Sequence, residues 1–73
     1  MKKKIIIEGM HCENCEKHIK TALEKIDGIK DVKVNHKKGI AIIKLEKDIA
    51  EDIIKKTIEE EDYKVIKIKK VLL

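Results

Sequence analysis

Apolar residues recur along this 73-residue chain with two different spacings, and these spacings predict an order of strands and helices. Residues 2–8 alternate as a strand does, with Ile5 and Ile7 on one face. Residues 15–26 instead carry apolar side chains at positions i, i+3, i+4 and i+7, which predicts a helix. Its apolar stripe consists of Ile19, Ala22, Leu23 and Ile26. Asp27 and Gly28 should end this helix, because glycine readily adopts the left-handed conformation.

The middle of the chain predicts a β-hairpin. Residues 29–35 and 40–46 both alternate between apolar and polar positions, and only the four residues 36–39 separate them. The expected inward positions are Val32, Val34, Ala41, Ile43 and Leu45. We expect Ile42 to lie beside Ile6 on the other, open face of the sheet. The two could form a small docking or dimerisation patch, although ordinary β-propensity explains them more economically.

A second helix and a last strand complete the pattern. Asp48 and Glu51 resemble a capping box, which predicts that a helix begins there. Its expected stripe is Ala50, Ile53, Ile54 and Ile58. Residues 63–70 predict a strand whose alternation changes phase between Val65 and Ile66, as a bulge or a frayed end would cause. The apolar end, residues 71–73, should either pack or fray.

The resulting order, βαββαβ, predicts an α+β protein with the ferredoxin-like arrangement. In that fold a four-stranded antiparallel sheet carries both helices on one face. We expect residues 1–73 to form a single domain, since a chain of this length builds one small core. Fifteen isoleucines, four valines and four leucines should fill that core without a bound metal.

Charge and hydropathy exclude several classes of function. Charged residues make up 44% of the chain, but the net charge is only +4 and the lysines are spread along the sequence. With one tyrosine and no other aromatic residue, the chain lacks the stacking groups that bind single-stranded nucleic acid. No apolar run approaches the roughly 18 residues of a membrane span. We therefore expect a cytoplasmic protein with no nucleic-acid partner and no direct membrane insertion.

The candidate chemistry lies in the only two cysteines, Cys12 and Cys15, spaced as C-x-x-C between the first strand and the first helix. Two thiolates suit a soft ion such as Cu(I), and Hg(II) or Ag(I) for the same reason. Structural Zn(II) usually takes four ligands, which one chain with two cysteines cannot easily supply. The sequence therefore predicts a metal site at Cys12 and Cys15 that favours Cu(I).

The position of the two cysteines predicts different roles. Cys15 should lie in the first helical turn, where free backbone N–H groups favour a thiolate. Cys12 precedes it and should be more exposed. We expect Cys12 to meet incoming metal first and Cys15 to complete the pair.

Thiol–disulfide exchange is the main alternative from another class, because C-x-x-C pairs also carry redox chemistry. A thioredoxin-type enzyme, however, has a longer fold and a cis-proline opposite its cysteines, and this chain has no proline. We therefore expect a protein that is not an enzyme.

The segment Gly9-Met10-His11-Cys12-Glu13-Asn14-Cys15 resembles the G-M-x-C-x-x-C signature of the heavy-metal-associated domain family. That family includes small copper chaperones, the N-terminal domains of copper-transporting P-type ATPases and periplasmic mercury-binding proteins. The resemblance implies that Cys12 and Cys15 are the metal ligands, that Met10 is a buried anchor of the loop and that Tyr63 lies beside the site.

Two departures from the family pattern concern the same region. Asp62 stands before Tyr63 where many members carry glycine, and His11 occupies a position where threonine or serine is commoner. His11 could add a third ligand, although an exposed side chain is the commoner outcome at such a position. We expect His18 to be exposed, and His36 to lie in the hairpin turn, away from the cysteines and without a role.

Together these features predict a freestanding copper chaperone that passes one Cu(I) by thiol ligand exchange to a copper-transporting P-type ATPase or to its metal-binding domain. The alternatives are a metal-binding domain of such a transporter and a mercury or zinc carrier. Three lysines of the predicted first helix could steer an acidic partner: Lys17, Lys20 and Lys25. Two copies could also share one Cu(I) through four thiolates, as a metal-bridged homodimer.

Overall fold

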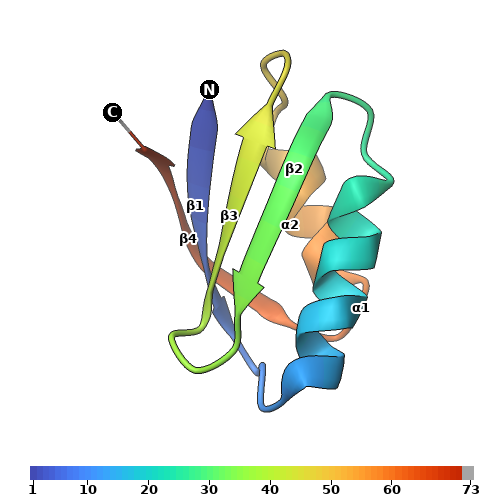
Figure 1. The fold of residues 1–73 in the computed structure, drawn as a ribbon, viewed down its shortest axis with the longest axis vertical. Helices are drawn as coiled ribbons and strands as arrows, with labels where there is room; N and C mark the ends of the chain where they lie inside the picture. The colour runs from blue at the N-terminus through green and yellow to red at the C-terminus, as the bar shows by residue number, and fades with distance from the viewer. Residues whose placement is uncertain (72–73) are drawn as a thin grey trace.

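The computed structural model describes residues 1–71, which form the predicted order of elements (Figure 1). The elements are β1 (Lys2–Glu8), α1 (Glu13–Glu24), β2 (Ile29–Asn35), β3 (Ile40–Leu45), α2 (Glu51–Glu59) and β4 (Lys64–Val71). The strands form one antiparallel sheet in the order β2-β3-β1-β4. Both helices cover the same face of this sheet (Figure 1), which confirms the ferredoxin-like fold. Of the apolar end, residues 72 and 73 lie outside the described residues.

The core lies between the sheet and the helices, and the alternating positions fill it as expected. Ile5 and Ile7 of β1 are buried, as are the inward residues of β3, Ala41, Ile43 and Leu45. From the helices, Ile19, Leu23, Ile54 and Ile58 are buried against them. Neither α1 nor α2 is long and apolar enough to span a membrane.

The predicted start of α2 is wrong. The residue that precedes its first turn is Ala50 and not Asp48, and no side chain caps this helix end. Ile49, with 6% of its surface exposed, reaches the core from the extended segment before the helix. The backbone of Ala50, between Ile49 and the helix, is not helical (φ −59°, ψ 136°), so the helix begins at Glu51. Ile53, predicted to face inward, is 50% exposed.

The change of phase in the last strand is a β-bulge. Ile6 pairs with Lys67, whereas the next residue of β1, Ile7, pairs with Val65. Ile66 is therefore the extra residue, and its side chain is 57% exposed. The bulge lets Val65 face the core while Ile68 packs against the core from the same face.

One charged residue of β1 faces the core layer beside the buried isoleucines of the strand. The side chain of Lys3 is almost fully buried, and its Nζ atom donates a hydrogen bond to the carbonyl oxygen of Ile49 at 3.4 Å. The same atom lies 3.8 Å from the Glu51 carboxylate. Lys3 therefore ties the first strand to the start of α2, which satisfies a charge that would be costly to bury alone.

The turn between α2 and β4 contains the one non-glycine residue with a positive φ angle among the described residues, Asp62 at 68°. This left-handed conformation costs a residue with a Cβ atom more than it costs glycine. The family's preference for glycine at this position thus has a conformational reason.

Replacing Asp62 by glycine should raise the free energy of unfolding by about 0.5–1 kcal/mol, because glycine adopts this φ without strain. Urea denaturation followed by circular dichroism measures the difference. Gly28→Ala is the opposing control: Gly28 has a φ of 100°, and an added Cβ would lie 3.2 Å from Ile49 Cδ1. This variant should lose about 1–3 kcal/mol. A destabilised Asp62→Gly variant would contradict the conclusion that the positive φ at Asp62 is strained.

Candidate metal centre

The cysteine loop joins the end of β1 to the start of α1, and the core holds it in place. Gly9 has a φ of 105°, which turns the chain out of the strand. Met10 then returns to the core with only 7% of its surface exposed. The predicted role of Met10 as a buried anchor agrees with this position. The following residues are left at the surface, at one end of the sheet (Figure 1).

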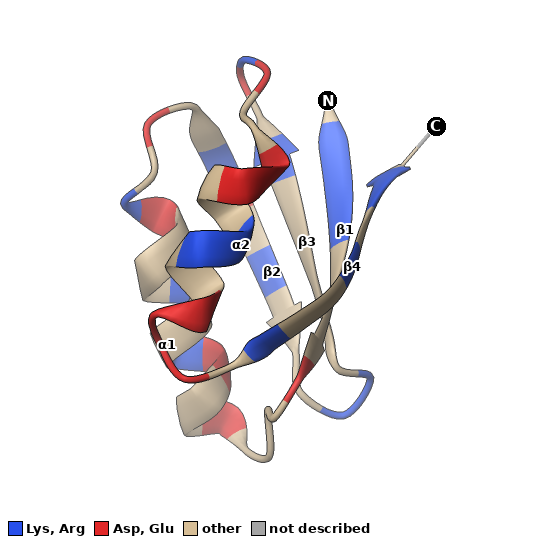
Figure 2. Ribbon diagram, turned by 180° about the vertical axis from the view of Figure 1, so that it is seen from behind, with Lys and Arg blue, Asp and Glu red and all other residues tan. Residues whose placement is uncertain are grey.

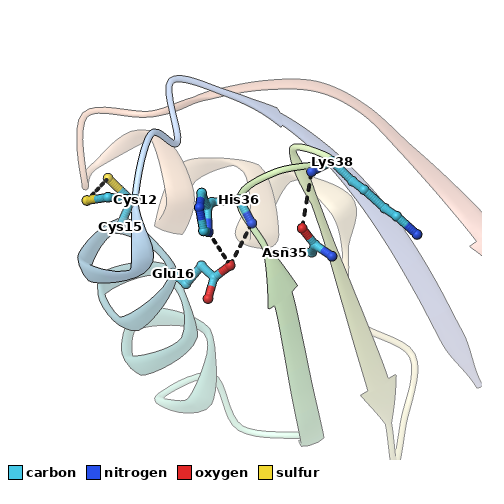
Figure 3. Close-up of polar contacts among 6 residues, drawn as sticks. All are labelled: Cys12, Cys15, Glu16, Asn35, His36 and Lys38. Carbon is cyan, nitrogen blue, oxygen red and sulfur yellow. Dashed lines mark hydrogen bonds and ion pairs between the residues drawn. The ribbon is translucent and has the colours of Figure 1, made fainter.

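The two cysteines lie side by side at the beginning of α1 (Figure 3). Cys12 immediately precedes the helix and is exposed, whereas Cys15 lies in the first turn and is partly buried. Their Sγ atoms are 3.7 Å apart and form no disulfide. The N–H of Cys15 donates to the carbonyl oxygen of Cys12 at 3.1 Å, so the helical turn holds the two cysteine backbones in a fixed relation.

The surroundings of Cys15 favour its thiolate form. The backbone N–H of His11 lowers its pKa most, and hydrogen bonding from the Tyr63 hydroxyl adds to this effect. Partial burial opposes both, and the resulting pKa is about 7, against an ordinary value of 9. At neutral pH a large share of Cys15 is therefore already in the form that binds soft metals.

Tyr63 lies beside the cysteine loop, as the family resemblance implied. It precedes β4, and its Cδ1 atom comes within 3.5 Å of the position that a Cβ on Gly9 would occupy. Hydrogen bonding to Cys15 raises the pKa of the Tyr63 phenol to about 12, with burial as the second cause. The phenol therefore remains a proton donor toward the sulfur across the physiological range.

The expected placement of His36 is wrong, because the hairpin turn lies next to the first turn of α1. The Glu16 carboxylate accepts a hydrogen bond from the backbone N–H of His36 at 2.7 Å. Nδ1 of the His36 ring lies 2.7 Å from the same oxygen (Figure 3). This contact could not be predicted from local sequence patterns, since its partners lie twenty positions apart and neither belongs to the apolar pattern.

The Glu16–His36 pair supports the helix end that carries Cys12 and Cys15, but it is not part of the cysteine pair itself. In Figure 3 the two sulfur atoms lie on the side of the helix end that faces away from His36. The backbone N–H of His36 is the main cause that lowers the pKa of Glu16, and its ring is the second. In the hairpin turn, Oδ1 of Asn35 accepts a hydrogen bond from the backbone N–H of Lys38 at 3.1 Å, which stabilises the turn.

The other two histidines are exposed. His11 lies in the loop and His18 on the outer side of α1. His11 borders a surface hollow that also contacts Cys12, His36 and Lys37. Among residues 1–71, no group of three or more histidine, cysteine, aspartate or glutamate side chains is arranged to hold a metal ion. The candidate metal ligands are Cys12 and Cys15.

The sequence model of one family, the heavy-metal-associated domain, matches residues 4–73. The chain belongs to this family. A copper chaperone CopZ from Staphylococcus aureus is 31% identical to this heavy-metal-associated domain over 61 residues, which cover 82% of this chain and 90% of that protein. A solved CopZ metallochaperone shares the fold with a TM-score of 0.85 and 28% identity, covering 90% of this chain and 100% of that one.

Longer proteins also contain a similar domain. A mercuric reductase from Lysinibacillus sphaericus is 40% identical over 68 residues, which cover 93% of this chain but 12% of that protein. A probable copper-exporting P-type ATPase from Archaeoglobus fulgidus is 36% identical over 67 residues, 90% of this chain and 8% of the ATPase. The heavy-metal-associated domain described here thus spans only a small part of these two relatives.

The thiolate of Cys15 should be detectable by alkylation. In a Cys12→Ser variant, the rate of reaction with iodoacetamide should fall as the pH drops through about 7, because the reactive thiolate is then protonated. Adding Tyr63→Phe should move this midpoint upward, since the phenol no longer stabilises the sulfur's charge. A midpoint that stays at the same pH in the Tyr63→Phe variant would show that the phenol has no such effect.

Removing the carboxylate of Glu16 should loosen the junction between α1 and the hairpin. We expect Glu16→Ala to lower the melting temperature by several degrees, because the backbone N–H of His36 loses its acceptor. Glu13→Ala is the matched control, since Glu13 is an exposed glutamate of the same helical turn. Equal melting temperatures for the two variants would contradict this role of Glu16.

Proposed function

We propose that this protein is a metal carrier that binds one Cu(I) through Cys12 and Cys15 and passes it on by thiol exchange. The carrying observation is the pair of thiols 3.7 Å apart at the surface. Within residues 1–71 they belong to no group of three or more histidine, cysteine, aspartate or glutamate side chains arranged for a metal ion. Soft thiolates select Cu(I), and two of them satisfy this ion, whereas structural Zn(II) sites take four ligands. The similarity to CopZ chaperones supports copper as the cargo.

The different environments of the two cysteines support an order of events. Cys12 is exposed and meets the ion first, and Cys15, held in the helical turn, completes the pair. During release the thiols of the acceptor bind the ion while these two leave one after the other. The Tyr63 hydroxyl favours the released Cys15 thiolate as a hydrogen-bond donor, which eases the last step.

The acceptor we propose is a copper-transporting P-type ATPase or its metal-binding domain. The similarity to a probable copper-exporting ATPase supports this choice, since a like domain in the acceptor would present the same pair of thiols. Four thiolates from two such domains around one ion would form the transfer intermediate. The same geometry would allow a metal-bridged homodimer. The exposed lysines Lys17 and Lys20 on α1 would guide an acidic acceptor toward the site.

A carrier needs no catalytic group, so on this proposal the protein is not an enzyme. It acts in the cytoplasm as a single domain. The rival redox function requires that the two thiols cycle through a disulfide without metal. Mercury is the second candidate cargo, because a mercuric reductase is 40% identical to this chain and Hg(II) accepts the same two thiolates.

Anaerobic competition against a chromogenic Cu(I) chelator tests the proposal. The reduced protein should retain one equivalent of Cu(I), and the Cys12→Ser/Cys15→Ser variant should retain none. His11→Ala is the control and should bind as the parent protein does. Parallel titrations with Hg(II), Ag(I) and Zn(II) rank the cargoes.

Three results would overturn parts of this proposal. Tight Zn(II) binding that requires His11, with weak Cu(I) retention, would indicate a zinc carrier. Failure to hold any of these metals would favour the redox alternative, which catalytic disulfide exchange would then establish. Metal uptake from a donor that survives Cys12→Ser but not Cys15→Ser would reverse the proposed order of the two cysteines.

A further inference from the structure

The fold gathers lysines on one surface although they are scattered along the sequence. Lysine bands mark each of the four strands in Figure 2. Strand register turns most of these lysines to the open face of the sheet, opposite the helices. Strand register places six of them on this face: Lys2, Lys4, Lys33, Lys44, Lys67 and Lys69. A seventh, Lys64, pairs with Glu8 at the end of β1 near the cysteine loop.

The charge on this face accounts for the net charge of the whole molecule. Only Glu8 and Asp31 oppose the seven lysines, which leaves a net charge of +5 on the open face. The other eleven lysines and twelve acidic residues of the chain sum to −1. The open face is therefore strongly basic, whereas the helical side is close to neutral.

The centre of the open face is aliphatic. Ile6, Ile40 and Ile42 lie on the two central strands, β1 and β3, and each is half-buried. A shallow hollow beside Ile42 is bordered by Lys2, Lys33 and Lys44, with Asp31 at its margin. An apolar centre thus lies within a wide, flat array of ammonium groups.

The residue types on this face indicate what it binds. Protein interfaces are enriched in arginine and aromatic residues and depleted in lysine, yet this chain contains no arginine and its only aromatic residue, Tyr63, lies beside the cysteines. Single-stranded nucleic acid needs stacking rings, and duplex DNA is read by a helix or a ribbon that enters a groove. A flat lysine array over aliphatic side chains instead matches a layer of phosphate headgroups, where lysine stems lie along apolar surface and their ammonium groups reach the phosphates.

We propose that the open face of the sheet docks on an anionic phospholipid bilayer. The lysines contact headgroup phosphates, and Ile6, Ile40 and Ile42 face the boundary with the acyl chains without crossing it. The cysteine loop lies at one end of the sheet, outside this face, so Cys12 stays accessible while the protein is docked (Figure 1). Docking uses none of the candidate metal ligands and goes beyond the proposed carrier function.

Flotation with phospholipid vesicles tests this surface. The reduced protein should float with vesicles of equal parts phosphatidylcholine and phosphatidylglycerol, but not with phosphatidylcholine alone. Raising the salt concentration should release it, because screening shortens the reach of the surface charge. The Cys12→Ser/Cys15→Ser variant should float like the parent protein, so this result does not depend on whether the protein carries metal.

Two charge-matched variants locate the contact. Lys4→Gln/Lys44→Gln/Lys67→Gln removes three charges from the open face and should weaken partitioning by about tenfold or more. Lys17→Gln/Lys20→Gln/Lys55→Gln removes three charges from the helical side and should change it by less than about twofold. Circular dichroism confirms that both variants are folded.

Several outcomes would overturn the proposal. Equal losses in the two triple variants would mean that net charge alone attracts the protein and that the open face has no special part. Equal flotation with neutral vesicles would exclude recognition of phosphate charge. Binding to poly-glutamate or duplex DNA through the same lysines, without binding to vesicles, would assign the face to an acidic polypeptide or to nucleic acid.

Discussion

The proposed metal binding depends on holding two thiols at the surface in a fixed relation to each other. A surface loop alone would not do this, because a short glycine-containing segment has many conformations to lose. Here the loop is fixed at both ends: Met10 is buried in the core, and the first turn of α1 sets the separation of Cys12 and Cys15. The carboxylate of Glu16 then ties this turn to the neighbouring hairpin. A small core thus orders a site that itself contributes little buried surface.

The same arrangement keeps the site open to exchange. The two sulfur atoms lie on the side of the helix end away from the Glu16–His36 pair, so the contact that supports this helix end leaves Cys12 exposed (Figure 3). Tyr63, which precedes β4 and lies beside Gly9, lowers the pKa of Cys15 through its hydroxyl. Support and access therefore come from different elements, and each could change in evolution without disturbing the other.

Much of the fold could be predicted from sequence because the apolar period differs sharply between strands and helices. The alternation in β1, β2 and β3 and the stripe of α1 are local signals, and a bulge was a natural explanation for the shift at Ile66. The start of α2 was placed wrongly because burial of Ile49 outweighed the capping signal of Asp48. The contact of Glu16 with His36 depends on which distant segments meet, and periodicity carries no record of that. The alternation of β1 does place Lys3 on the face of Ile5 and Ile7, but its partners Ile49 and Glu51 lie in a distant segment.

The two outer strands, β2 and β4, each contain an irregularity in register, at Lys30 and at Ile66. An exposed, regular edge invites a strand from another molecule, and its addition can continue into a fibril. A bulge interrupts the row of free N–H and C=O groups, and the lysines of both strands repel a like edge. The domain can therefore exist at high concentration in a crowded cell without joining its sheet to that of a neighbour.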